Sequence, residues 1–187
     1  MTLSPEAQYW DRGVDLVPMM TGALAVMDAT DVESIAGELG IALPFRNVLD
    51  IGCGTGRASK HCDGYMGVDI APSMVEFCRR RSLKADVITG PADLDRGPFD
   101  WVLCLSVFTH ISREERQAYL AAFARRAPNL LVDIIPGDGT GSVAMWTAQE
   151  EGFIQDAVKA GFDVKGCCDR TSDTGVRHRY FLAEWAL

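Results

Sequence analysis

The sequence predicts an α/β protein in which a mostly parallel sheet is covered by helices on both faces. Two observations support this prediction. Segments of strand length alternate with segments of helical periodicity between residues 47 and 135, an order that is typical of βαβ units. The strand segments, such as Trp101–Leu105, are apolar at successive positions, and such strands are buried on both faces of a parallel sheet.

Two helices are predicted before the first strand. In Ser4-Pro5-Glu6, a Ser suited to the N-cap precedes a Pro at the first helical position and an acid in the first turn. The short helix that begins there carries Tyr9 and Trp10. The segment Thr30–Glu33 has the pattern of a capping box, and Gly40 is expected to end the second helix.

The remaining elements follow in alternation. Strands are predicted at residues 47–51, 65–69, 86–89, 99–105 and 130–135. A glycine turn and a short helix follow the first strand, and further helices are predicted from Pro72, from the capping-box pattern Ser112–Glu115 and around residues 146–160. The tail is predicted to form a strand pair at residues 162–164 and 179–185, with its turn at residues 171–175.

Length and composition indicate one globular domain. A chain of 187 residues with 48% hydrophobic residues suits a single packed core. Within this domain, residues 1–44 are expected to form an N-terminal helical cap and residues 45–187 the α/β core.

Charge and cysteine usage exclude several classes of partner. The net charge of −8 argues against nucleic acid, because proteins that bind it neutralise phosphates with Lys and Arg. No apolar run reaches the ~20 residues that cross a bilayer, and the N-terminus lacks the basic and apolar segments of a signal peptide. None of the six cysteines forms a CxxC pair, which predicts no zinc site and a reducing compartment. We therefore expect a cytoplasmic protein with no membrane, nucleic-acid or metal partner.

Three glycines after the first strand predict a ligand site. Gly52, Gly54 and Gly56 can adopt positive φ and allow a ligand to approach the backbone closely. Asp50 precedes them, and Asp69 ends the next strand, where a carboxylate can accept hydrogen bonds from two vicinal ribose hydroxyls. In an open α/β sheet, ligands bind outside the carboxyl ends of the strands, which is the edge where these residues are expected.

The spacing of the glycines separates two kinds of nucleoside site. A dinucleotide site has the fingerprint G-x-G-x-x-G, whereas this chain has G-x-G-x-G preceded by an acid. The segment Val48–Gly56 resembles motif I of class I S-adenosylmethionine (SAM)-dependent methyltransferases. Residues 67–74 resemble the family's segment at the second strand, and residues 99–111 resemble its fourth-strand motif. The resemblance covers about residues 45–135 in register.

The resemblance implies a fold and a cofactor. The fold is a doubly wound, mostly parallel seven-stranded sheet with helices on both faces and an antiparallel last strand, as in Rossmann-like proteins. The cofactor is SAM, with S-adenosylhomocysteine as the product. The methionine moiety would be held by the first loop, through Asp50, Gly52, Cys53, Gly54 and Gly56.

The resemblance also implies contacts for the nucleoside. Asp69 would bind the ribose hydroxyls, and Ile70 and Met74 would flank the adenine. Ala92 and Asp93 match the segment that contacts the adenine edge, although this chain has Pro91 where the family often has an acid, and Asp86 is the alternative. Leu105 and Ser106 would lie beneath the cofactor.

His110 is the candidate general base. It follows the fourth strand, and an unperturbed pKa of ~6.5 suits proton removal near neutrality. The alternative interpretation is a structural histidine in a loop. Tyr9, Trp10 and Trp146 are candidates, together with His110, to line the acceptor pocket, with core packing as the alternative for these aromatic residues.

The acceptor is expected to be a small molecule, methylated at oxygen or nitrogen. The fourth strand ends in Leu105–Phe108 and lacks the Asn/Asp-Pro-Pro-Tyr/Phe signature of similar enzymes that methylate amide or base nitrogens. Two alternatives stay open: a non-catalytic protein that binds SAM as a sensor or structural ligand, and a methyltransferase that acts on a macromolecule with a partner subunit. A NAD-dependent oxidoreductase is a more distant alternative.

Overall fold

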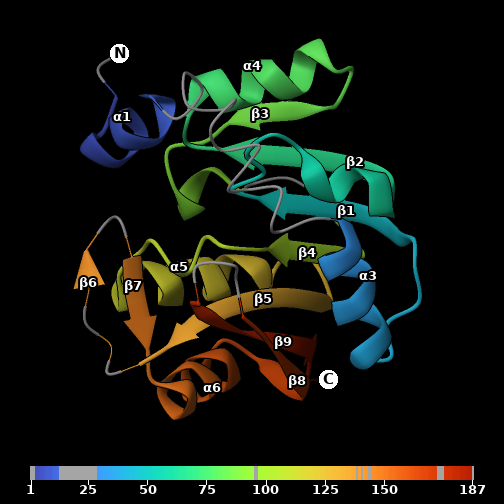
Figure 1. The fold of residues 1–187 in the computed structure, drawn as a ribbon, viewed down its shortest axis with the longest axis vertical. Coiled ribbons are helices and arrows are strands. Elements are labelled where there is room, and N and C mark those ends of the chain that lie inside the picture. Colours follow the sequence, from blue (N-terminus) through green and yellow to red (C-terminus); the bar gives the residue numbers. More distant parts are fainter. Residues whose placement is uncertain are drawn as a thin grey trace.

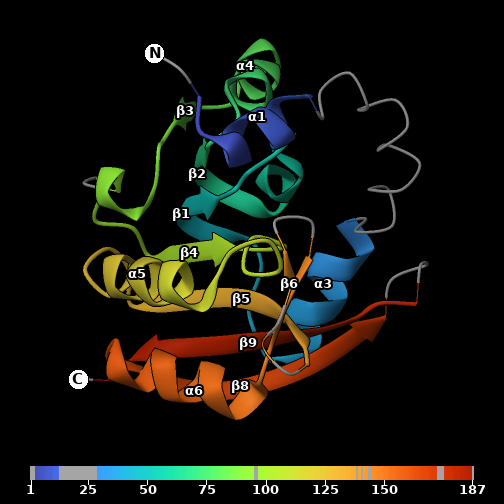
Figure 2. The ribbon, with the colours of Figure 1, turned by 90° about the vertical axis from the view of Figure 1, so that its left-hand side faces the viewer.

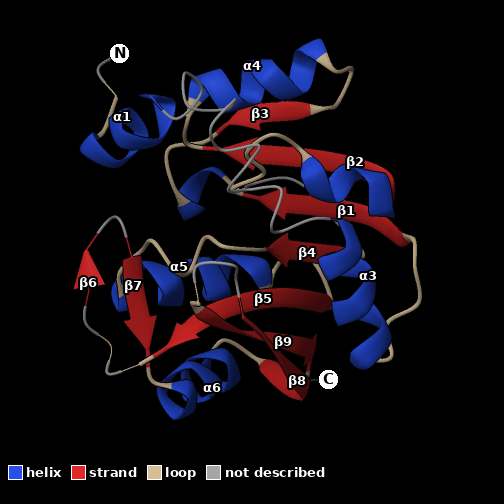
Figure 3. Cartoon of the chain, in the orientation of Figure 1, coloured by secondary structure: helices blue, strands red, loops and turns tan. Residues whose placement is uncertain are grey.

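A parallel sheet with helices on its two faces organises the chain (Figure 1 and Figure 3). The computed structural model describes residues 3–12, 29–94, 97–137, 139, 141–142, 145–171 and 175–186. The α-helices are α1 (Pro5–Asp11), α3 (Ala29–Glu38), α4 (Pro72–Arg80), α5 (Arg113–Phe123) and α6 (Glu150–Lys159), and two 3₁₀ helices are η2 (Arg57–His61) and η3 (Pro91–Asp93). The strands are β1 (Phe45–Ile51), β2 (Cys62–Asp69), β3 (Ala85–Val87), β4 (Trp101–Cys104), β5 (Asn129–Pro136), β6 (Gly141–Ser142), β7 (Met145–Ala148), β8 (Phe162–Thr171) and β9 (Arg177–Trp185).

The main sheet has the order β3-β2-β1-β4-β5-β9-β8. Strands β1 to β5 pair with one another in parallel. Strand β9 runs antiparallel to both β5 and β8. The prediction of a doubly wound, mostly parallel sheet with an antiparallel last strand is therefore confirmed.

Two short strands extend this sheet beyond the seven that were expected. Strand β7 pairs in parallel with the end of β5, at Ile135 and Pro136, and β6 pairs with β7 in antiparallel. The prediction of a helix around residues 146–160 is thus wrong in its first turn. The helix α6 begins only at Glu150. The carboxylates of Glu150 and Glu151 in its first turn interact favourably with the positive end of the helix dipole.

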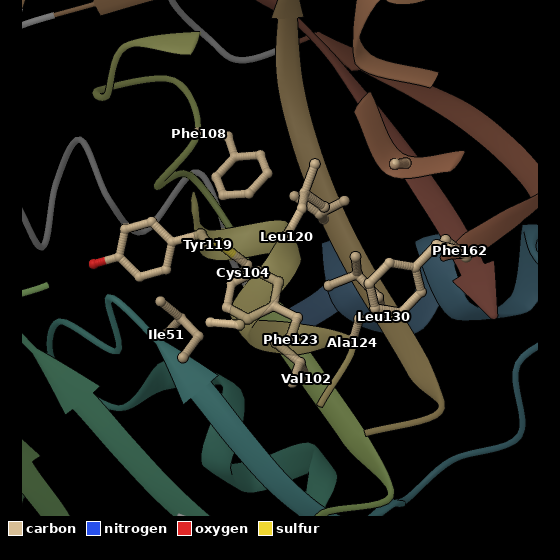
Figure 4. Packing of buried hydrophobic residues seen from close by; sticks show 14 of the residues in the cluster. Ile51, Val102, Cys104, Phe108, Tyr119, Leu120, Phe123, Ala124, Leu130 and Phe162 are labelled. Carbon is tan, nitrogen blue, oxygen red and sulfur yellow. The ribbon is translucent and has the colours of Figure 1, made fainter. Parts of the chain in front are cut away.

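Helices cover both faces of the sheet (Figure 2). On one face, Phe123 of α5 and Phe153 of α6 pack against strand residues such as Leu130 (Figure 4). On the other face, Ile35 of α3 packs with Val48 of β1. Because adjacent strand residues point to opposite faces, the strands β1, β4, β5, β8 and β9 contribute to both clusters.

Capping residues set the ends of several helices. Ser112 and Glu115 form the predicted capping box of α5. Gly40 has a φ of +69° and ends α3, with the Ile41 N–H donating to the Ala36 carbonyl at 2.7 Å. The capping box predicted at Thr30 is wrong, because Thr30 lies inside α3, which already includes Ala29.

Helix α1 lies at the carboxyl edge of the sheet, beside α4 (Figure 1). Ser4 caps it as predicted, accepting a hydrogen bond from the Ala7 N–H at 3.2 Å. Asp11 at its end accepts a hydrogen bond from the Ser73 N–H at 2.9 Å, which ties α1 to the first turn of α4. In the described part of the chain, no helix has the length and apolar character that crossing a bilayer requires.

Candidate functional site at the carboxyl edge of the sheet

A cavity opens at the carboxyl edge of the sheet, where the loops after β1, β2, β3 and β4 meet beneath α1. Its empty volume is about 970 Å³, including the space at its open mouth. Most side chains that line it are apolar, and the charged ones among them are Asp69 and Arg57.

The three glycines after β1 have different roles. All three have positive φ, with values of +61° at Gly52, +51° at Gly54 and +75° at Gly56. A Cβ at Gly52 would lie 2.3 Å from the Val107 Cγ2 atom, and one at Gly56 would lie 2.4 Å from the Leu83 Cδ1 atom. A Cβ at Gly54 would meet no described atom within 4 Å. Gly52 and Gly56 therefore allow close packing, whereas Gly54 leaves backbone exposed to the cavity.

Asp69 connects this glycine loop to the end of β2. Its Oδ2 atom accepts a hydrogen bond from the Gly54 N–H, and its Oδ1 atom accepts one from the Ala71 N–H, each at 2.9 Å. Burial raises the pKa of this carboxyl, and the backbone N–H donors partly offset the rise. Each carboxylate oxygen keeps further acceptor capacity, so Asp69 can still bind a hydroxyl group in the cavity that it lines.

Asp50 lies on the other side of the glycine loop. It lines a smaller hollow that shares Gly52, Arg57 and Leu105 with the main cavity. The Tyr65 hydroxyl donates a hydrogen bond to its Oδ2 atom at 2.7 Å. Burial raises the Asp50 pKa to about 7, against the effect of that hydrogen bond. A cationic ligand group near Asp50 would favour its charged form.

The floor of the cavity is formed by the loop after β4, which a buried aspartate holds in place. Ser106 lines the cavity and has a φ of +61°, which is unusual for a residue other than glycine. Its N–H donates to the Oδ1 atom of Asp133 at 2.5 Å, and the other oxygen of Asp133 lies 2.8 Å from the His178 Nδ1 atom. Asp133 is fully buried in β5, so this carboxylate links β9 to the cavity floor.

Two aromatic rings meet at the wall of the cavity. The ring centroids of Trp10 and His110 lie 4.5 Å apart, at an interplanar angle of 65°. Both residues line the cavity. The His110 N–H donates to the Val107 carbonyl at 2.9 Å. Tyr9 packs against the edge of Trp10, but it is 49% exposed and lies outside the cavity lining.

The predicted nucleoside contacts fall into two groups. Ile70 and Met74 line the cavity, whereas Ala92 and Asp93 are exposed on η3 and do not. Asp93 instead accepts hydrogen bonds from Thr89, at 2.6 Å from its N–H and 2.7 Å from its hydroxyl. Asp86 pairs with Arg79 at 2.6 Å.

The other predicted site residues are placed as follows. Cys53 and Leu105 line the cavity. Trp146 belongs to β7, but its side chain lies outside the described part of the structure. Lining residues that the sequence analysis did not single out are Thr55, Arg57, Ile51, Ile88, Val107, Ile111 and Tyr119. Tyr119 lies on α5 among apolar residues whose helical spacing predicts core packing, so its hydroxyl is the one feature that signals a different role.

We expect Asp50 to make stability depend on pH. Its pKa of about 7 in the folded state lies above its ordinary value of 3.8. At a pH between these two values, Asp50 is protonated in the folded state and deprotonated in the unfolded state. The unfolding free energy therefore falls as pH rises from about 4 to about 7. Asp50→Asn should remove this fall, which is on the order of a few kcal/mol. Urea unfolding at several pH values measures it, with D63N at exposed Asp63 of β2 as the control. An unchanged pH profile in D50N would contradict the assignment.

Asp133 should prove essential for the cavity floor. Asp133→Ala leaves the Ser106 N–H and His178 without their buried partner, and such losses cost about 3 kcal/mol or more of unfolding free energy. Asp133→Asn keeps an acceptor for Ser106 and should recover at least half of the loss. Chemical denaturation of the two variants tests this expectation. It fails if D133A unfolds at the wild-type denaturant concentration.

Comparisons with known proteins agree with this geometry. Residues 48–127 match the model of a methyltransferase-domain family. No curated protein sequence matches the chain. The fold is similar to that of the Burkholderia thailandensis 1,6-didemethyltoxoflavin-N1-methyltransferase, solved with its substrate and S-adenosylhomocysteine (18% identity, TM-score 0.69, covering 97% of this chain and 87% of that one).

Two further solved structures share the fold. Magnesium protoporphyrin IX methyltransferase from Synechocystis PCC 6803, with bound S-adenosylhomocysteine, has 21% identity and a TM-score of 0.65, covering 94% of this chain and 83% of that one. A putative methyltransferase from Haloferax volcanii, in complex with the activator Trm112, has 14% identity and a TM-score of 0.75, covering 100% and 98%. The family match over residues 48–127 and the cavity at the glycine loop support the predicted resemblance to the class I SAM-dependent methyltransferase superfamily, with SAM as its cofactor.

Proposed function

We propose that this protein transfers the methyl group of SAM to an oxygen or nitrogen atom of a small-molecule acceptor. The observation that carries the proposal is a single cavity that joins the Gly54 backbone and Asp69 to Trp10 and His110. A cofactor site and a candidate proton acceptor thus share one enclosed space. Methyl transfer requires this proximity, because the acceptor atom must be aligned with the methyl group.

The residues of the carboxyl edge fit SAM. Gly54 presents open backbone, and Asp69 has acceptor capacity left for the ribose hydroxyls. We propose that Asp50, in the adjoining hollow, faces the α-ammonium of the methionine moiety. Ile70 and Met74 offer apolar contacts to the adenine, and Leu105 and Ser106 of the loop after β4 would lie beneath the cofactor.

His110 is the proposed proton acceptor. When bound, SAM supplies a methyl group made electrophilic by the adjacent sulfonium. The protein then has to align the acceptor, exclude water and remove a proton from it. His110 is suited to the last task, because its ring lies in the cavity wall while its backbone N–H holds the loop through Val107. The Trp10 ring packs against the His110 ring and lines the same cavity.

The lining of the cavity favours a small, weakly charged acceptor. The charged lining residues among the described part are Asp69, which we assign to the cofactor, and Arg57. Two similar folds belong to enzymes named for small molecules, a toxoflavin precursor and a magnesium porphyrin. The chain's net charge of −8 is unfavourable for a polyanionic substrate.

Binding of SAM without transfer is a second candidate. The contact between Trp10 and His110 favours it, because the two rings occupy space that an acceptor would need. A structure with the same fold is named as a [4+2]-cyclase (12% identity, TM-score 0.72), so the fold alone does not imply methyl transfer. Turnover on any acceptor from a small-molecule panel would reject this candidate.

Calorimetric titration tests the cofactor site. SAM and S-adenosylhomocysteine should both bind the wild-type protein. Asp69→Ala should weaken both by about tenfold or more, because it removes a charged hydrogen-bond acceptor and releases Gly54. D63A, at the other end of β2, is the matched control and should bind like the wild type. The absence of heat at millimolar SAM would reject the site.

The role of His110 is tested with an acceptor found by screening for S-adenosylhomocysteine release. His110→Ala should lower kcat by about 100-fold, as loss of a general base does, and leave the Kd for SAM within about threefold because the cofactor contacts remain. H61Q is the control, because His61 lies on η2 outside the cavity lining. Activity of H110A within a few-fold of the wild type would remove His110 as the base.

A further inference from the structure

Tyr119 places a hydroxyl group where the apolar pattern of α5 predicts only packing. Its ring packs on Phe123, with the ring centroids 5.7 Å apart. The side chain is 6% exposed, yet it lines the cavity. Figure 4 shows its hydroxyl turned away from Leu120 and Phe123, which point into the core. The polar end of Tyr119 therefore faces the cavity while its ring belongs to the core.

The hydroxyl of Tyr119 makes no hydrogen bond to any residue that the structure describes. The Tyr119 oxygen is not among the sealed polar atoms that lack a partner, so it is accessible from the cavity. Burial also raises the pKa of this phenol, so it stays neutral and offers both a donor and an acceptor. A ligand group in the cavity can therefore form a hydrogen bond with it.

Tyr119 lies on the nucleoside side of the cavity. Its helix α5 packs against η3, in the segment after β3, and Asp69 at the end of β2 lines the same cavity. Ile88, just beyond β3, lines the same cavity. Asp50, by contrast, lines a hollow together with Ile35 of α3, on the opposite face of the sheet from α5. A ligand with its ribose at Asp69 and its ammonium at Asp50 therefore places its base toward Tyr119.

The segment after β3 offers no side-chain partner for that base. Pro91 has no polar side chain, and neither Ala92 nor Asp93 lines the cavity. Asp93 is already bonded to Thr89. Ile70 and Met74 provide only apolar contacts. Among the described residues on this side of the cavity, Tyr119 carries the polar atom that can distinguish one base from another.

We propose that the Tyr119 hydroxyl oxygen accepts a hydrogen bond from the exocyclic amino group of the adenine in SAM. Adenine carries this donor at its 6-position, and the unpartnered hydroxyl of Tyr119 supplies a matching acceptor. The inference rests on the cofactor site of the proposed function and adds to it the residue that reads the base. Tyr119 would thus be a specificity residue on α5, outside the loops that the sequence motifs mark.

Binding measurements with two ligands test the proposal. One ligand is S-adenosylhomocysteine, and the other is its analogue with unsubstituted purine, which lacks the 6-amino group. The wild type should prefer the adenine ligand by about tenfold, the size expected for one hydrogen bond of ~1–1.5 kcal/mol. The Tyr119→Phe variant should bind S-adenosylhomocysteine about tenfold more weakly than the wild type does. Its affinities for the two ligands should differ by no more than about threefold.

Tyr65→Phe is the matched control. It removes another tyrosine hydroxyl near the site, the one bonded to Asp50, so it should keep the wild-type preference for adenine. The melting temperature gives a second readout. Because the Tyr119 hydroxyl has no partner within the described chain, apo Y119F should melt at or above the melting temperature of the apo wild type. Added S-adenosylhomocysteine should raise the melting temperature of Y119F less than it raises that of the wild type.

The possible outcomes separate the two proposals. Three results would each overturn the role of Tyr119 alone. Y119F could keep the wild-type preference for the adenine ligand, the wild type could show no preference, or apo Y119F could melt well below the wild type. A wild-type protein that binds neither ligand would overturn the cofactor site as well. Both ligands lack the transferable methyl group and no acceptor is present, so the result does not depend on the acceptor or on His110.

Discussion

The hydrogen bond from the Gly54 N–H to Asp69 fixes the geometry on which the site depends. It joins the loop after β1 to the end of β2, so the two segments that would hold the cofactor are positioned before any ligand binds. The side chains packed beside Gly52 and Gly56 hold the same loop from two further directions. Such preorganisation lowers the conformational cost of binding, and Gly54 is left as the point where a ligand can approach the backbone.

Buried carboxylates give this edge of the sheet its electrostatic character. Asp50, Asp69 and Asp133 are 4%, 7% and 0% exposed in a protein that is already acidic. Each carboxylate has polar partners: a phenol for Asp50, backbone N–H groups for Asp69, and Ser106 with His178 for Asp133. These partners make the burial of the acids tolerable. Burial alone disfavours the charged form of these acids. A cofactor with positive charges on sulfur and nitrogen suits this edge, because its attraction to the carboxylates favours their charged form.

The parts of the fold that could be predicted are those that local pattern determines. Apolar runs located β1, β2, β4 and β5, and the G-x-G-x-G spacing located the loop that lines the cavity. The hairpin of β6 and β7 was missed because its strands are short, and its pairing with Ile135 depends on tertiary contact rather than on periodicity. Asp133 and His178 are 45 positions apart, and no local pattern relates them. Tyr119 shows a third limit, since helical spacing places a side chain on a face but does not say whether its polar end meets core or cavity.

The loop after β4 connects the cofactor side of the cavity to the acceptor side. A side chain at Gly52 would collide with Val107, so the glycine loop and the β4 loop are in direct contact. The Val107 carbonyl in turn accepts the His110 N–H, and Asp133 holds the neighbouring Ser106. The backbone of the loop that carries His110 is therefore tied to the glycine loop and to Asp133 by short contacts. In-line methyl transfer requires such rigidity, because a displacement of about 1 Å in the reacting groups can cost about 100-fold in rate.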